Sequence, residues 1–226
     1  MLARLIDAVF PPRCAACSRG EGPFCSTCVA TLVRCDPHPV EPSPAGVDAL
    51  RAPFAYEGAA RRAVLNLKFS GARHVVGALA GSMAEAFGAA SADAVTWAPL
   101  GSRRRRERGF DQGRLLARAI ARELGLPVLG LLERTRETAP QARRGAAERR
   151  VAMHGAFSAR RPAPRAVLLV DDVVTTGATV AACAVALRAA GARRVVVLAA
   201  ARAIARSYTP DGPASGSVVA RGTSPR

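Results

Sequence analysis

The fold is decided by the stretch Val167-Leu168-Leu169-Val170-Asp171-Asp172-Val173-Val174-Thr175-Thr176-Gly177-Ala178-Thr179. The valine and leucine residues 167–170 predict a buried strand, and the alanine-rich residues 177–190, which stop at Gly191, predict a helix. Residues 195–200 predict a second strand. A strand, a helix and a strand in this order form a βαβ unit, which implies a parallel sheet and an α/β fold.

The turn between the first strand and the helix has the chemistry of a sugar-phosphate site. Gly177 permits close backbone approach, and the free amides at the helix start donate to phosphate oxygens, as do the threonine hydroxyls. Asp171 and Asp172 are suited to two ribose hydroxyls or to the water shell of Mg²⁺. We expect the ribose to lie at the two acids and its 5-phosphate at the threonines. The less favoured alternative is that the two acids only end a strand and the turn only caps a helix. The predicted ligand-binding residues of this stretch are Asp171, Asp172, Val174, Thr175, Thr176, Gly177, Ala178 and Thr179.

Four cysteines near the N-terminus predict a metal site. Cys14 and Cys17 form one Cys-x-x-Cys pair, and Cys25 and Cys28 form another. Two such pairs match a tetrahedral four-thiolate zinc site, with no ligand position left open, so the zinc is expected to be structural. A redox pair and a disulfide are the competing interpretations. Cys35 and His38 form either part of a second knuckle or alternative ligands.

The rest of the chain divides into a few segments. We expect a zinc module at 1–36, a proline-rich linker at 37–48, an α/β domain at 49–204 and a disordered tail at 205–226. Within the domain, strands are predicted at 49–56, 94–98 and 128–132, and helices at 59–69, 75–87 and 113–124. Residues 141–151 are expected to form a polar helix or an ordered loop.

Composition limits the class of protein. The formal net charge of +16 arises almost wholly from arginine, since Lys68 is the only lysine. Such a charge attracts polyanions such as nucleic acid, although arginines also simply solvate helix faces. No apolar run approaches the ~20 residues of a membrane span, and the first residues do not form a signal peptide, so a soluble, cytoplasmic protein is expected.

Residues 101–110 form a strongly basic segment. They carry five arginines between glycines, which predicts an exposed, mobile loop. The arginines of such a loop bind either a diphosphate or a nucleic-acid backbone, with Phe110 available to stack on a base. A solvated charge run is the remaining interpretation. For a nucleic-acid contact, the candidate residues are Arg105, Arg106, Arg108 and Phe110.

Residues 167–179 resemble the phosphoribosyl-diphosphate signature of the type I phosphoribosyltransferases, and residues 12–204 resemble the ComF family of competence-associated proteins. The resemblance extends to the cysteine module and to several short motifs: Tyr56-Glu57-Gly58, Leu67-Lys68-Phe69, Pro99-Leu100, Arg108-Gly109-Phe110-Asp111-Gln112, Gln141 and Gly155-Ala156-Phe157. The chain departs from the family pattern at Trp97-Ala98, at Asp111 and at Met153-His154.

The resemblance implies an α/β, type I phosphoribosyltransferase-like domain behind a small zinc ribbon. It implies that phosphoribosyl diphosphate binds with Mg²⁺, with Lys68, Pro99 and Leu100 as further ligands. Arg103 and Arg104, together with Asp171 and Asp172, are then the catalytic candidates.

Two functions follow from the resemblance. One is a phosphoribosyl-diphosphate-binding protein that acts in DNA uptake or processing, with single-stranded DNA and recombination or DNA-uptake proteins as partners. The alternative is an active phosphoribosyltransferase that transfers ribose 5-phosphate to a nitrogenous base and has no role with DNA. The acceptor is not evident from the sequence.

Overall fold

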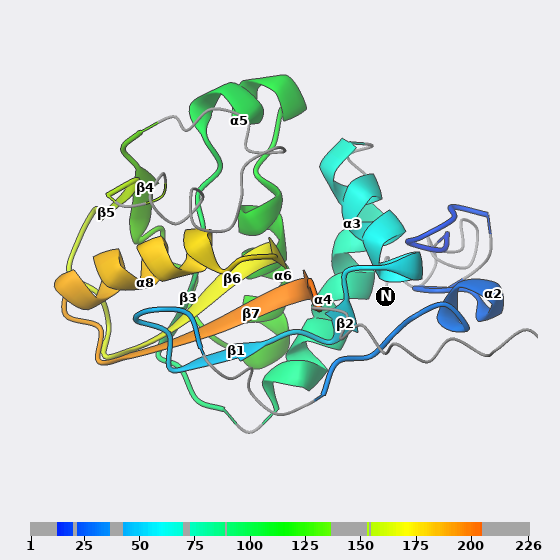
Figure 1. Cartoon of the computed structure of the whole chain (residues 1–226), viewed down its shortest axis with the longest axis horizontal. Helices are drawn as coiled ribbons and strands as arrows, with labels where there is room; N and C mark the ends of the chain where they lie inside the picture. Colours follow the sequence, from blue (N-terminus) through cyan, green and yellow to red (C-terminus); the bar gives the residue numbers. More distant parts are fainter. Residues whose placement is uncertain are drawn as a thin grey trace, which may run out of the picture.

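A parallel β-sheet forms the centre of the molecule (Figure 1). The computed structural model describes residues 13–19, 22–36, 43–69, 73–88, 90–136, 153 and 155–204. Within them the sheet has the order β1-β7-β6-β3, and a short strand, β2, also pairs with β7. All of these pairings are parallel. The strands are β1 (Ala49–Arg51), β2 (Phe54–Ala55), β3 (Ala94–Trp97), β6 (Ala166–Val174) and β7 (Arg194–Arg202).

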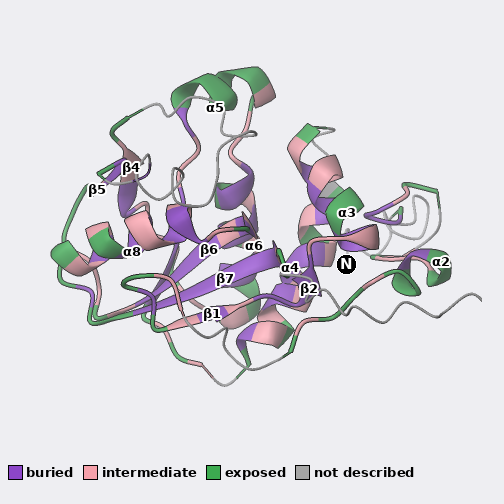
Figure 2. Ribbon diagram, viewed as in Figure 1, coloured by how far each residue is buried: buried purple, intermediate pink, exposed green. Residues whose placement is uncertain are grey.

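Helices cover both faces of this sheet. Leu168 and Val170 of β6 pack in one core cluster with α3 (Gly58–Phe69), α4 (Arg73–Phe87) and α6 (Gln112–Leu124). Val167 and Leu169, which point to the other face because side chains alternate along a strand, pack with α8 (Ala178–Ala189). Both central strands are therefore buried on two sides, as Figure 2 shows in purple, and this explains their continuous apolar runs.

Among the described residues, four smaller elements lie outside this sheet and its covering helices. The helix α5 (Ser102–Arg108) follows β3 and is exposed along its length apart from Arg108. The antiparallel pair of β4 (Leu132–Arg134) and β5 (Phe157–Ala159) lies beside α8, and α2 (Ser26–Val29) belongs to the cysteine module.

The α/β class and the parallel sheet are confirmed, and several element bounds differ from those predicted. The predicted strand 49–56 is broken into β1 and β2, and the predicted strand 128–132 makes only one bridge, from Val128 to Val95, before β4 begins at Leu132. The predicted loop at 101–110 is largely helical, because Gly101 and Gly109 bound a run of good helix formers. Strand β6 continues through both aspartates to Val174. The segment 141–151, the tail 205–226, Gln141, His38 and His154 lie outside the described residues.

Part of the segment expected to be a linker packs against the domain. Val47 is buried, and the Asp48 carboxylate accepts hydrogen bonds from Arg188 and from the amide of Val195, both at 2.6 Å. Residues 43–48 therefore hold the start of β1 against α8 and β7.

Candidate functional site

A cavity of about 270 Å³ lies at the carboxyl ends of β3 and β6. Open α/β sheets place their ligands at this edge. The cavity is lined by Tyr56, Lys68, Ala98, Pro99, Leu100, Arg104, Arg108, Gln112, Gly113, Arg134, Asp171, Asp172, Val173, Thr175 and Thr179. We call it the β6 cavity. Its charged groups come from four separate parts of the chain, which only the fold brings together.

Asp172 is the most constrained acid of the β6 cavity. It points to the sheet face covered by α3 and α6, where Lys68 of α3 lies 3.1 Å from Oδ1 and the amide of Gln112 donates to Oδ2 at 2.9 Å. The Asp172 side chain is 8% exposed and that of Lys68 19% exposed. Because both partners are anchored on helices, the carboxylate has a fixed position, with its acceptor oxygens at the cavity wall.

Asp171 points to the opposite face of the sheet, because it is adjacent to Asp172 in a strand. Burial raises the pKa of its carboxyl group above the ordinary value, and the negative charge of Asp172 raises it further. One oxygen of Asp171 accepts from the amide of Asp172 at 2.8 Å, which partly offsets this effect. The two acids therefore differ in environment: Asp172 is ion-paired with Lys68, and the pKa of Asp171 is raised above its ordinary value.

Two buried polar atoms at the β6 cavity have no hydrogen-bond partner among the described residues. They are Oε1 of Gln112, whose residue is 6% exposed, and Nη1 of Arg108. Burial lowers the pKa of Arg108, and its guanidinium lies 5.3 Å from the centre of the Phe69 ring. Burying a polar group without a hydrogen-bond partner lowers stability by about 1–3 kcal/mol. An unpartnered acceptor and an unpartnered donor at one cavity therefore indicate a ligand with both hydroxyl and anionic groups.

The threonine turn forms the adjoining end of the site. A small hollow of about 30 Å³ is lined by Asp171 and residues 173–180. Gly177 has φ +73°, and a Cβ at this position would lie 2.8 Å from Cγ of Pro44, so only glycine fits without displacement. The helix α8 begins at Ala178, and its first amides face the turn, as an anion site requires.

Most of the predicted ligand residues come together here. Lys68, Pro99, Leu100, Arg104, Asp171, Asp172, Thr175 and Thr179 line the β6 cavity, and Val174, Thr176, Gly177 and Ala178 line the hollow beside it. Arg103 lies outside both linings and pairs with Glu107 on the exposed side of α5 at 2.8 Å.

The four predicted nucleic-acid contacts are dispersed. Arg108 lines the β6 cavity, whereas Arg105 and Phe110 line a second, larger cavity, and Arg106 lines neither. The periodicity of α5 explains the separation, because successive residues of a helix point in different directions.

Gln112 was not among the predicted ligand residues, and Arg108 was assigned to nucleic acid instead. The only sequence signal for both was the stretch Arg108–Gln112, which resembles the ComF pattern. The burial of Gln112 depends on the packing of α6 against β6, a tertiary contact with no local signature.

The cysteine module has the geometry of a metal site. The Sγ atoms of Cys14, Cys17, Cys25 and Cys28 all lie within 4.8 Å of one another. Those of Cys17 and Cys25 are 3.8 Å apart, which equals the separation of about 3.8 Å expected when four sulfurs surround a zinc ion at about 2.3 Å. The cluster fits a zinc ribbon, as predicted from the spacing.

The protein environment favours a thiolate at one ligand. Burial by itself raises the pKa of Cys14, but hydrogen bonds with the backbone of Cys25, Cys17 and Ala16 lower it to about 6. Burial raises the pKa of Cys28 to about 12, so this thiol releases its proton only to a metal or a strong base.

The helix α3 connects the cysteine module to the sheet. Asn66 donates to the carbonyls of Ala15 and Ala16 at 2.8 and 3.2 Å, and Arg62 donates to the Thr31 hydroxyl at 3.3 Å. Gly58 begins this helix with φ +51°, and a Cβ there would overlap the carbonyl oxygen of Thr31. The module therefore docks closely on the helix that carries Lys68.

Cys35 lies outside the four-cysteine cluster. Its sulfur accepts from Nε of Arg202 at 3.3 Å, and its amide donates to the carbonyl of Pro53. Within the described residues the cluster therefore comprises two Cys-x-x-Cys pairs alone.

No known family model matches the chain. Competence protein F of Haemophilus influenzae is 35% identical over 116 residues, which cover 49% of this chain and 51% of that protein. The chain is similar to competence protein F. The DNA utilization proteins YhgH of Escherichia coli O157:H7 and Salmonella typhi are 40% and 39% identical over 107 residues, which cover 46% of this chain and 47% of each. The chain spans about half the length of these curated relatives, and they confirm the resemblance seen in its motifs.

Solved structures give a weaker likeness. The allosteric regulatory enzyme of purine biosynthesis matches with a TM-score of 0.38 and 25% identity over 55% of this chain and 25% of its own. The glutamine phosphoribosylpyrophosphate amidotransferase of B. subtilis, complexed with ADP and GMP, matches with a TM-score of 0.37 and 27% identity over 54% of this chain and 25% of its own. Among the described residues, no helix combines the length and the apolar character needed to cross a bilayer.

Proposed function

We propose that the protein binds phosphoribosyl diphosphate together with Mg²⁺ in the β6 cavity and serves DNA uptake or DNA processing. The proposal rests on two buried polar atoms beside Asp172 that have no hydrogen-bond partner among the described residues. They are the Gln112 oxygen and the Arg108 guanidinium nitrogen. The ligand class they favour offers a hydroxyl to the first and an anionic oxygen to the second.

The distribution of charge supports one orientation of the ligand. Asp171 and Asp172 accept from ribose hydroxyls, and the hydroxyls and amides of residues 175–179 hold the 5-phosphate at the start of α8. Lys68, Arg104 and Arg108 add positive charge to the lining of the same cavity, which favours the diphosphate of the ligand. Pro99 and Leu100 also line this cavity.

Mg²⁺ would be held by Asp171 or Asp172 together with waters and the phosphates of the ligand, since it is usually bound through one or two carboxylates. It would neutralise charge on the diphosphate. The chain's own residues fix the ribose and bind the phosphate oxygens.

The role with DNA rests on the relatives. Competence protein F and the DNA utilization proteins carry that role in their names, and they are 35–40% identical over about half of this chain. The net charge of +16 is consistent with a polyanion partner. Single-stranded DNA, with recombination or DNA-uptake proteins, is the proposed set of partners.

Calorimetry with phosphoribosyl diphosphate, in the presence and absence of Mg²⁺, tests the ligand. We expect saturable binding that Mg²⁺ strengthens, and weaker binding of ribose 5-phosphate, which lacks the diphosphate. Equal affinities for the two compounds would contradict the proposal that Lys68, Arg104 and Arg108 bind the diphosphate.

The alternative function, transfer of the phosphoribosyl group to a base, is tested separately. The assay measures diphosphate release from phosphoribosyl diphosphate across a panel of nitrogenous bases, with Asp171→Ala as the inactive control. Base-dependent release that this variant abolishes would establish an enzyme.

A further inference from the structure

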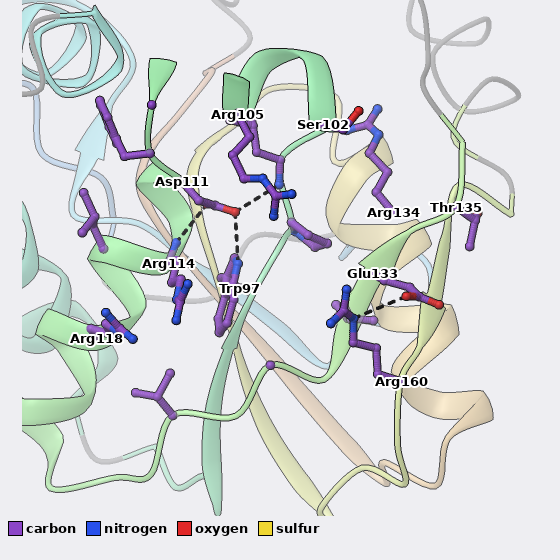
Figure 3. A pocket seen from close by; sticks show the side chains of 18 of the residues that line it. Trp97, Ser102, Arg105, Asp111, Arg114, Arg118, Glu133, Arg134, Thr135 and Arg160 are labelled. Atoms are coloured by element: carbon purple, nitrogen blue, oxygen red, sulfur yellow. Dashed lines mark hydrogen bonds and ion pairs between the residues drawn. The ribbon is translucent and has the colours of Figure 1, made fainter. Parts of the chain in front are cut away.

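A second cavity, of about 990 Å³, lies between α5, α6 and the β4–β5 pair (Figure 3). Its volume is at the upper end of small-molecule sites, which span about 300–1,000 Å³. It shares only Pro99, Leu100 and Arg134 with the β6 cavity. We call it the Trp97 cavity, after the ring that lines it at the end of β3.

The Trp97 ring is held in a fixed orientation. Its indole nitrogen donates to Oδ2 of Asp111 at 3.3 Å, as Figure 3 shows. Two glycines leave room for the ring, since a Cβ on Gly113 would lie 3.5 Å from it and a Cβ on Gly130 would lie 3.3 Å from it. The ring is half-buried and therefore offers a flat surface that loses little freedom when a second ring stacks on it.

The walls of the Trp97 cavity are strongly basic. Six arginines line it against two acids, Asp111 and Glu133. Both acids are engaged: Asp111 also accepts from the amides of Leu100 and Arg114, and Glu133 pairs with Arg160 at 3.4 Å. The net positive charge is therefore available to an anion. The arginines are Arg105, Arg114, Arg118, Arg134, Arg160 and Arg161.

The Trp97 ring and one of the arginines lie next to each other in this cavity. The Arg114 guanidinium lies 5.8 Å from the centre of the Trp97 ring, which shows that a planar cation already associates with it. Arg118 lies one turn further along α6, and Arg160 approaches from the opposite wall (Figure 3). A ligand that fits has a flat ring for Trp97 and a phosphate within reach of these guanidinium groups.

We propose that the Trp97 cavity binds a nucleotide, with the base stacked on Trp97 and the phosphate held by arginines of α6 and by Arg160, which follows β5. This site goes beyond the proposed function of the β6 cavity and shares with that cavity only Pro99, Leu100 and Arg134. A free mononucleotide and a unit of single-stranded DNA share this chemistry, and the experiment below distinguishes these two sources.

The chain contains a built-in probe, because Trp97 is its only tryptophan. Titration with AMP is expected to change Trp97 fluorescence saturably, as a stacked base does. Adenosine, which lacks the phosphate, and ribose 5-phosphate, which lacks the base, are expected to bind at least about tenfold more weakly. A ten-nucleotide oligodeoxyadenylate tests the second source: tighter binding than AMP identifies single-stranded DNA as the ligand, and weaker binding identifies the free nucleotide.

Two matched variants locate the effect. Arg118→Gln is expected to weaken nucleotide binding about tenfold, because it removes one charge-assisted contact. Arg122→Gln removes the same charge one turn further along α6, outside the lining of the Trp97 cavity, and is expected to leave the affinity within about twofold. Binding of phosphoribosyl diphosphate, measured by calorimetry, is expected to be unchanged in both variants, which separates this site from the β6 cavity.

Three results would overturn the proposal. They are the absence of a saturable change with either AMP or the oligonucleotide, an equal response to ribose 5-phosphate, and an equal loss in the two variants. The last would show attraction by overall charge alone.

Discussion

The ammonium group of Lys68 lies 3.1 Å from the carboxylate of Asp172 and joins the last turn of α3 to the end of β6. Two residues earlier, Asn66 holds the backbone of the cysteine module. One helix therefore supports the module at one surface and the β6 cavity at its end. The position of Lys68 depends on how firmly this helix is held.

Replacement of Lys68 tests its part in ligand binding. Lys68→Met keeps the aliphatic chain and removes the charge, which leaves Asp172 with Gln112 as its neighbour. We expect the affinity for phosphoribosyl diphosphate to fall at least about tenfold and the free energy of unfolding to fall by about 1–3 kcal/mol. Calorimetry and denaturant unfolding measure these two effects. Arg61→Gln, an exposed position on the same helix, is the control and is expected to change neither.

Replacement of Gln112 is expected to affect ligand binding with little effect on stability, unlike replacement of Lys68. Gln112→Leu removes both the bond to Asp172 and a buried acceptor that has no partner among the described residues, so the two effects on stability oppose each other. We expect stability to change by less than about 1 kcal/mol while affinity for phosphoribosyl diphosphate falls about tenfold. A loss of stability with unchanged affinity would show that Gln112 is structural only.

Zinc removal is expected to unfold the cysteine module and to loosen α3. The buried thiols need a metal to be ionised together, and the module has only a small apolar cluster of its own. We expect one zinc per chain, a lower melting temperature with a chelator, and weaker binding of phosphoribosyl diphosphate in the metal-free protein. Elemental analysis, thermal unfolding and calorimetry measure these effects. Cys35→Ser is the control, and a fall in zinc content in that variant would contradict the four-cysteine assignment.

The docking of the module is tested through Gly58. In Gly58→Ala the new methyl group would overlap the carbonyl oxygen of Thr31 in a backbone conformation that alanine rarely adopts. We expect faster zinc loss to a chelator and a lower melting temperature. Gly77→Ala on α4, where a Cβ meets nothing within 4 Å, is the matched control and is expected to be neutral or slightly stabilising. Equal zinc loss from both variants would mean that docking on α3 does not protect the site.

The raised pKa of Asp171 predicts a pH effect on stability. The pKa of this group is raised to about 8 by burial and by the charge of Asp172, from an ordinary value of 3.8. Between these values the folded protein binds a proton that the unfolded chain releases, so stability falls as pH rises from about 4 to about 8. Asp171→Asn removes this pH-dependent contribution to stability. In denaturant unfolding, wild type is expected to lose more stability than the variant across that window, whereas Glu123→Gln, an exposed position on α6, follows wild type.

The sequence alone predicts the parts of the molecule whose signals are local. The βαβ unit, the threonine turn and the two Cys-x-x-Cys pairs lie in continuous stretches, and the structure confirms the parallel sheet and the cysteine cluster. The partner of Asp172 is not local, because Lys68 and Gln112 reach it from two helices distant in sequence.

The Trp97 cavity was not predicted for the same reason. Trp97 and Asp111 were noticed only as departures from the ComF pattern, and their hydrogen bond arises where β3 meets the start of α6. The basic segment 101–110 was predicted to be an exposed loop, but it is largely helical, and its arginines divide between two cavities and solvent.

The binding of phosphoribosyl diphosphate in the β6 cavity is tested most directly by calorimetry on two arginine variants of α5. Arg108→Gln and Arg106→Gln remove the same charge two residues apart. Of the two, only Arg108 lines the cavity, with a nitrogen that has no partner in the part of the chain that the structure describes. The account predicts at least about a tenfold loss of affinity in the first variant and less than about a twofold loss in the second. Equal affinities in the two variants, whether both are reduced or both are unchanged, would contradict it.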